Sequence, residues 1–89
     1  MKAVVTVVGH DTVGILAKVS AVCADNNANI LDVTQSVMQD LFTMVMLLDI
    51  SEITSDFSGL QNALYVLGEK IGMKIHVMHE DIFNSMHHI

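Results

Sequence analysis

The chain has 89 residues, of which 52% are hydrophobic and 16% charged, a composition typical of a compact folded domain rather than a disordered one. The chain has ten acidic residues, four lysines and no arginine. Its formal charge of −6 therefore disfavours binding to nucleic acid or to an anionic membrane surface. The apolar runs are too short for a membrane span, and the start of the chain turns polar too early for a signal peptide, so we expect a cytoplasmic protein.

The first predicted strand covers Lys2 to Val8, where apolar and β-branched residues occupy both alternating positions, as in a strand buried on two faces. The loop after it carries two glycines, Gly9 and Gly14, with the four-residue separation of a phosphate-binding P-loop. Ile15 and Leu16 stand where that motif has its lysine and its hydroxyl residue, so the P-loop interpretation fails. The pattern instead predicts a strand-to-helix turn that can receive a ligand.

A first amphipathic helix is predicted from about Val13 to Asn26, with Asp11 or Thr12 as its N-cap. Asn26 and Asn27 tolerate a left-handed backbone, which favours the end of the helix at this point. The apolar stripe includes the single cysteine, which we expect to be a buried and unreactive thiol. The residues of this stripe are Ile15, Leu16, Val19, Val22, Cys23 and Asn26.

Two further strands are predicted next, from Asn29 to about Gln39 and from Leu41 to Ile50. Gln39 and Asp40 form a plausible two-residue hairpin turn between them, although neither is a glycine. The second of these strands is apolar on both faces, whereas the first carries polar residues among its apolar ones. We therefore expect the Leu41–Ile50 strand to be central in the sheet.

A second amphipathic helix is predicted from Phe57 to Ile71, because its apolar residues recur at spacings of three and four. Ser58 and Gln61 have the spacing of a capping box, and Gly72 is placed to end the helix. The fourth strand, Met73 to about His79, alternates apolar and polar residues, as an edge strand does.

The last ten residues predict a short C-terminal helical tail, because four apolar residues recur there at helical spacing. These residues are Ile82, Phe83, Met86 and Ile89. We divide the chain accordingly into one domain, residues 1–79, and a tail, residues 80–89.

The order of elements is that of a ferredoxin-like α+β fold, a βαββαβ two-layer sandwich. With the two-sided apolar strands in the centre and the others at the edges, the antiparallel sheet has the order 4-1-3-2 and both helices lie on one face. The other sheet face is then left open to water unless a second copy of the chain or the tail covers it.

The stretch GHDTVGILAKVSAVCADNNANILDVTQ, Gly9 to Gln35, resembles the first half of an ACT domain, a small regulatory module of amino-acid metabolism. The segment FTMVMLLDI and the ending HEDIFNSMHHI are similar to a family of small stand-alone ACT proteins of bacteria and archaea, so the resemblance covers essentially the whole chain. Many ACT domains have proline before the second glycine, where this chain has Val13. The resemblance to an ACT domain rests on Asp11, Gly14, Ile15, Leu16, Ala17, Val19, Asn29 and Ile30.

The resemblance implies an amino-acid ligand, bound where the first strand-to-helix loop of one protomer meets the second strand of its neighbour. Backbone N–H groups around Gly14, at the positive end of the helix dipole, suit the ligand carboxylate, and oxygens of Asp11 and Asn29 suit its ammonium. Asp11 stands where serine-binding ACT domains carry an asparagine, so the ligand's identity does not carry over. The expected ligand-binding residues are His10, Asp11, Thr12, Val13, Gly14, Ile15 and Asn29.

The sequence thus predicts a non-enzymatic sensor, at least a dimer, that binds an amino acid or related metabolite and alters the activity of an unidentified protein partner. No nucleophile lies beside a base and no carboxylate pair is recognisable, which argues against an enzyme. Neither a cofactor nor a metal ion is expected. A sheet that binds RNA would need exposed aromatic and basic residues, and aromatics make up only 4% of this chain.

Two alternatives remain open at this point. In the first, the chain oligomerises without any ligand, Gly14 serves only helix packing and Asp11 only caps the helix. In the second, histidines near the C-terminus bind zinc or nickel, although their spacing argues against a preformed site. These histidines are His76, His79, His87 and His88.

Overall fold

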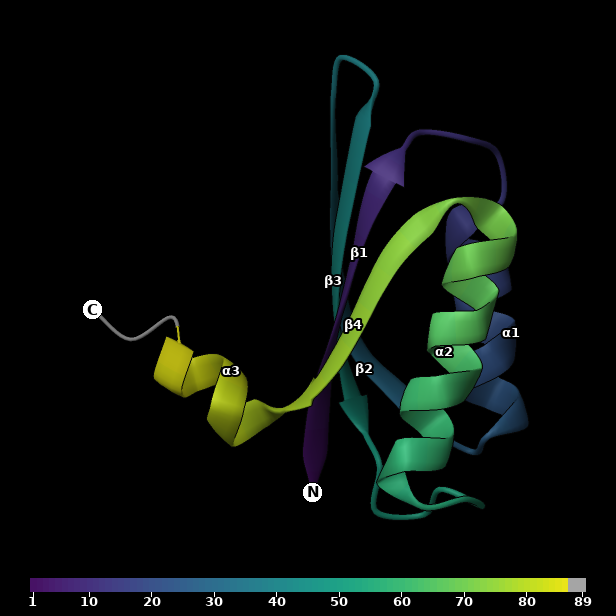
Figure 1. Cartoon of the computed structure of the whole chain (residues 1–89). Helices are drawn as coiled ribbons and strands as arrows, with labels where there is room; N and C mark the ends of the chain where they lie inside the picture. The colour runs from purple at the N-terminus through teal and green to yellow at the C-terminus, as the bar shows by residue number, and fades with distance from the viewer. Residues whose placement is uncertain (87–89) are drawn as a thin grey trace.

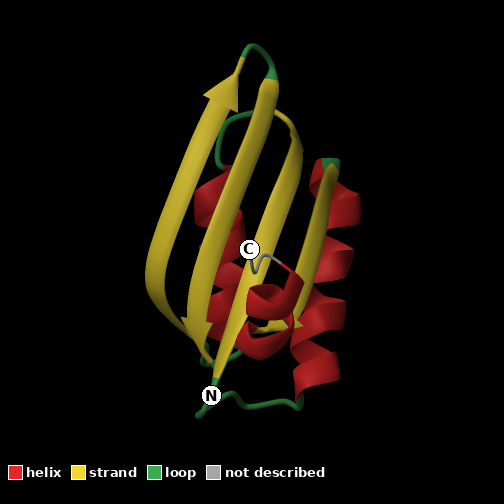
Figure 2. Ribbon diagram, turned by 90° about the vertical axis from the view of Figure 1, so that its left-hand side faces the viewer, coloured by secondary structure: helices red, strands yellow, loops and turns green. Residues whose placement is uncertain are grey.

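The computed structural model describes residues 1–86, which form one four-stranded antiparallel sheet with two helices packed on one of its faces (Figure 1). A third, short helix follows the last strand and lies across the opposite face of the sheet (Figure 2). The elements in chain order are β1 (Lys2–His10), α1 (Ile15–Asp25), β2 (Asn29–Met38), β3 (Leu41–Asp49), α2 (Phe57–Ile71), β4 (Met73–His79) and α3 (Glu80–Met86).

The sheet order β2-β3-β1-β4 confirms the predicted ferredoxin-like arrangement, with the two apolar strands in the centre. Side chains that point toward α1 and α2 form the core, and the register pairs Val5 with Met46 and Val7 with Met44 at its middle. Leu60 and Leu64 of α2 belong to the same core cluster as these pairs and are fully buried. The core therefore lies between the central strands and the two helices.

The start of α1 differs from the prediction that Asp11 or Thr12 caps the helix. Gly14 is the N-cap residue, with φ +86°, and the helix has no side-chain cap. Asp11 is instead drawn toward the β2–β3 hairpin, because its backbone N–H donates to the carbonyl of Asp40 at 2.8 Å. Asp11 is thus held at the hairpin, three residues before the N-cap residue Gly14.

The start of α2 also differs, since Ser58 and Gln61 do not form a capping box. The Asp56 carboxylate caps this helix by accepting a hydrogen bond from the N–H of Gly59 at 2.8 Å. The Gln61 side chain points the other way, and its Nε2 donates to the carbonyl of Val77 on β4 at 2.9 Å. Gly72 ends the helix in a left-handed conformation, as predicted.

The remaining helix and hairpin ends follow the sequence closely. α1 ends at Asp25, and Asn27 takes the left-handed backbone expected in this region, with φ 59°. The β2–β3 turn contains the expected two residues, and Gln39 accommodates it with φ 56°. Leu16, predicted to lie within the buried stripe of α1, is partly exposed, whereas Ile15, Val19 and Cys23 are buried.

Helix α3 covers only part of the sheet face that α1 and α2 leave open (Figure 2). It contacts β1 and β4, and Val4 on that face is almost completely buried. Within the single chain, however, Ile82 and Met86 are 53% and 67% exposed, and only Phe83 of the apolar residues in α3 is partly buried. Ile89 lies outside the described residues. None of the helices formed by residues 1–86 has the length and apolarity that a bilayer crossing requires.

Candidate functional site

The loop between β1 and α1 carries most of the predicted ligand-binding residues, and it lies at the same end of the sheet as the β2–β3 turn. The register pairs His10 with Leu41, and the Asp11 N–H bond to Asp40 holds the loop against the turn. His10, Asp11, Thr12 and Val13 are all exposed, and among the large apolar residues of positions 1–86 Val13 is the most exposed, at 91%. Their side chains are therefore accessible to a ligand or to another protein.

The N-terminus of α1 combines uncapped backbone N–H groups with one nearby lysine. The first N–H groups of any helix lack intrahelical acceptors, and here no side chain caps them and no acidic residue lies in the first turn. The side chain of Lys18 folds back over Gly14, so that its Cε would lie 3.7 Å from a Cβ at that position. Lys18 has no ion-pair partner within residues 1–86. An anion would offset both positive contributions.

Lys18 was not identified from the sequence as a site residue. The signal that could have revealed it is its position four residues after Gly14, since residues i and i+4 are neighbours on a helix. Asp40 was also missed, because its proximity to Asp11 results from the pairing of β1 with β3.

An open groove of about 430 Å³ lies beside this loop, on the β2–β3 hairpin. Gly9 and His10 form one side of it, and residues 38–41 form the other. Met38 is 72% exposed there, so the groove offers an apolar surface next to an imidazole and the Asp40 carboxylate. As formed by residues 1–86, the groove is shallow and open to solvent.

Asn29, the remaining predicted site residue, lies at the opposite end of the sheet. It pairs with Asp49 at the end of β3, whereas the loop lies beside Leu41 at the start of β3. Eight residue steps along an antiparallel strand separate these ends by roughly 27 Å. One chain therefore does not bring Asn29 and Gly14 into a common site.

The outer half of β2, residues 34–38, is exposed on both sheet faces and also lies at the edge of the sheet. Val37 faces the helix side but is 53% exposed, because the hairpin extends beyond α1 (Figure 1). An edge strand with uncovered apolar side chains is prone to pair with another strand. This part of the molecule has the properties of an interface.

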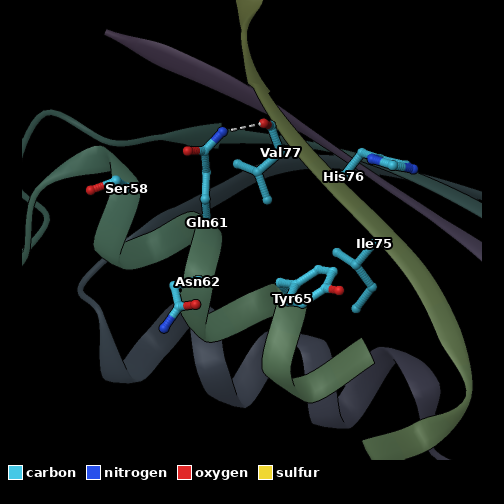
Figure 3. Close-up of a pocket in the computed structure, with 7 residues that line it drawn as sticks. All are labelled: Ser58, Gln61, Asn62, Tyr65, Ile75, His76 and Val77. Carbon is cyan, nitrogen blue, oxygen red and sulfur yellow. Dashed lines mark hydrogen bonds between the residues drawn. The ribbon is translucent and has the colours of Figure 1, made fainter. Parts of the chain in front are cut away.

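A second groove runs between α2 and the other edge strand, β4. It comprises two adjoining hollows of about 360 and 380 Å³ that share Tyr65, Ile75 and His76. Figure 3 shows the first hollow, with Tyr65 beside Ile75 and the Gln61 side chain reaching the Val77 carbonyl. No residue of the predicted site lines this groove.

The histidines and the cysteine do not form a metal site in the part of the chain that the structure describes. No group of three or more His, Cys, Asp or Glu side chains within residues 1–86 is arranged to hold a metal ion. His76 is exposed, while His79 stacks on Phe57 with ring centroids 4.0 Å apart. His87 and His88 lie outside the described residues. Burial raises the pKa of the Cys23 thiol to about 11, so this thiol is protonated at neutral pH.

Comparison with known proteins places this architecture among ACT domains. Residues 2–78 match a family model described as an ACT domain. A UPF0237 protein of Methanococcus maripaludis is 59% identical over 86 residues, which cover 97% of this chain and 96% of that protein. A UPF0237 protein of Clostridium perfringens is 51% identical over 89 residues, the full length of both chains.

Solved structures with the same fold include an ACT domain protein from Streptococcus pneumoniae. It has a TM-score of 0.81 and 38% sequence identity, and the match covers 93% of each chain. A putative glycine cleavage system transcriptional repressor has a TM-score of 0.75 and 25% identity. That match covers 85% of this chain but only 43% of the repressor chain.

Proposed function

Since the chain belongs to the ACT domain family, we propose that it is a cytoplasmic, non-enzymatic regulatory module that binds an amino acid or a related metabolite between two copies of itself. The observation that carries this proposal is the uncapped N-terminus of α1 at Gly14. A regulatory role is in keeping with the resemblance to a glycine cleavage repressor. Through binding, the module would change the activity of a partner protein.

The placement of Asn29 supports a site shared between two copies. If the β2 strands of two copies paired antiparallel across a two-fold axis, the Asn29 end of one strand would lie beside the Met38 end of the other. Met38 is at the end of the sheet where the β1–α1 loop lies. Such a dimer would bring the loop of one copy toward Asn29 of the second copy and would cover the exposed half of β2.

The charges at the loop suit a zwitterion. The α1 N-terminus and Lys18 offer positive charge for a carboxylate, while the Asp11 side chain is an exposed acceptor for an ammonium group. The Asn29 side-chain oxygen of the second copy would supply a further acceptor. A ligand with both groups would therefore contact both copies and stabilise the assembled form.

The proposal is tested by a thermal-shift screen of the twenty amino acids. A ligand at one hundred times its dissociation constant adds about 2.7 kcal/mol to the stability of the folded state. A positive hit should also shift the protein toward the dimer in sedimentation velocity, because the site spans two copies. If the chain forms a dimer that no amino acid or related metabolite stabilises, it is an assembly module without a ligand.

Replacing Asn29 with alanine is expected to weaken ligand binding by roughly 1–3 kcal/mol, because the bound ammonium would lose a buried hydrogen-bond acceptor. The affinity is measured by isothermal titration calorimetry with the ligand from the screen. Asn62→Ala is a matched control, since this exposed amide lies on α2, away from both the β1–α1 loop and β2. An unchanged affinity in Asn29→Ala would leave Asn29 with only a structural role.

Deleting residues 81–89 is expected to weaken the assembly or to expose apolar surface on the open sheet face. Helix α3 contacts β1 and β4, and Val4 beneath it is only 4% exposed. The assembly is measured by sedimentation velocity and the surface by fluorescence of an anilinonaphthalene sulfonate dye. A full-length chain that sediments as a monomer at tens of micromolar, or a truncation that changes neither signal, would contradict the prediction.

A further inference from the structure

The free edge of β4 borders the groove between α2 and β4. One hydrogen bond shows which backbone groups of β4 point toward this edge. The carbonyl of Val77 accepts from Nε2 of Gln61 and therefore points away from β1, the only strand that pairs with β4 in the described sheet. In an antiparallel strand, the N–H and C=O of one residue point the same way, and alternate residues share that direction. Met73, Ile75 and Val77 thus present their backbone groups to the free edge.

The groove has the length and shape for an extended chain. Its two hollows follow β4 from Val77 to Met73 and adjoin at Tyr65 and Ile75. Gly68 lets α2 pack directly on the strand, because a Cβ there would lie 2.7 Å from the Met73 carbonyl oxygen. An added strand would lie beside β4 with alternate side chains against Tyr65, which is 57% exposed.

The side chains along this edge define the charge of the partner. Lys74 and His76 are exposed on the sheet face away from α2, opposite to the buried side chains of Ile75 and Val77. An added strand would place alternate side chains next to these two basic groups, which favours acidic residues at those positions. Glu69 lines the groove on the α2 side, which favours uncharged residues there.

A second copy of this chain fits the edge poorly. Two-fold pairing of β4 with itself, centred on residue 74, would bring Lys74 opposite Lys74. Like charges directly opposite destabilise a strand pair. Centring the pair on residue 75, 76 or 77 would bring Val77 opposite Met73, Ile75 or Val77 of the second copy, and both copies would then have to displace the Gln61 amide from the Val77 carbonyl.

We propose that the β4 edge is a docking site for an extended peptide segment of another protein, which adds a fifth strand and carries acidic side chains beside Lys74 and His76. The segment pairs with Met73 and Ile75, and the Gln61 amide marks the end of the pairing at Val77. This site lies at the opposite edge of the sheet from β2 and does not depend on a metabolite.

The test uses full-length protein labelled with nitrogen-15 and the five-residue peptide acetyl-Val-Glu-Thr-Glu-Val-amide. We expect saturable NMR shifts at the amides of Met73, Ile75 and Val77, with half-saturation at about 1 mM or below. Lys74→Glu should weaken binding about tenfold and should improve binding of the peptide with lysine in place of glutamate. Lys70→Glu is the matched control, because Lys70 does not line the groove.

A comparison of two peptides distinguishes strand pairing from simple charge attraction. Each peptide carries one N-methyl group, and the two methylated residues are neighbours in the sequence. Neighbouring N–H groups of an extended chain point in opposite directions, so only one of the two methyl groups faces β4. One peptide should therefore bind at least about tenfold more weakly than the other. Equal binding of both, no saturation up to about 5 mM, or shifts centred on β2 would overturn the proposal.

Discussion

Replacing Gly14 with aspartate is expected to abolish ligand binding while the protein stays folded. The new carboxylate would stand at the N-terminus of α1, where the ligand carboxylate is proposed to bind, and would repel it. A side chain at φ +86° costs roughly 1–2 kcal/mol, which a fold stabilised by about 5–15 kcal/mol tolerates. Apart from its chain neighbours, the one atom of residues 1–86 within 4 Å of the new Cβ is Lys18 Cε, which lies at the ordinary contact distance of 3.7 Å.

The measurement is calorimetry with the ligand from the thermal-shift screen, and far-UV circular dichroism checks the fold. Gly14→Asn is the matched control, because asparagine has the size of aspartate and a similar tolerance of the left-handed backbone without the charge, and it should retain much of the affinity. Equal loss in both variants would assign the effect to the backbone conformation of the loop. Unchanged binding in Gly14→Asp would remove the α1 N-terminus from the site.

Replacing Leu64 with alanine is expected to lower the free energy of unfolding by about 2–5 kcal/mol, a large part of the stability of a small domain. Leu64 lies on the face of α2 that packs against the central strands, and it is fully buried. Its removal leaves a cavity between two layers that are held together mainly by apolar contacts. The change is measured by urea denaturation at one fixed protein concentration, since assembly adds to apparent stability.

Leu16→Ala provides the comparison for this prediction. It is the same substitution in a helix, but Leu16 is 36% exposed, so we expect a loss below about 1 kcal/mol. A loss as large as that at Leu64 would contradict an exposed Leu16 and would indicate that a second copy covers this part of α1. A loss near zero at Leu64 would contradict the core described above.

The local features that a few neighbouring residues decide could be predicted from the sequence. The spacing of apolar residues located α2 at Phe57–Ile71, and the turn at Gln39 and Asp40 followed from a break between two strand-like runs. Strand composition was sufficient for the sheet order, because a strand that is apolar on both faces has to be central. The same short-range patterns carried the resemblance to ACT domains.

The caps and the shape of the candidate site depended on contacts between residues far apart in the chain. Asp11 does not cap α1, because the strand register places its backbone N–H beside the Asp40 carbonyl. Gln61 does not form the predicted capping box, because its side chain donates to the Val77 carbonyl instead. The same register placed Asn29 and Gly14 at opposite ends of the sheet. Sequence periodicity specifies which residues face the core. Only the pairing of the strands decides which polar groups meet, because a hydrogen bond forms where the register brings its donor and acceptor together.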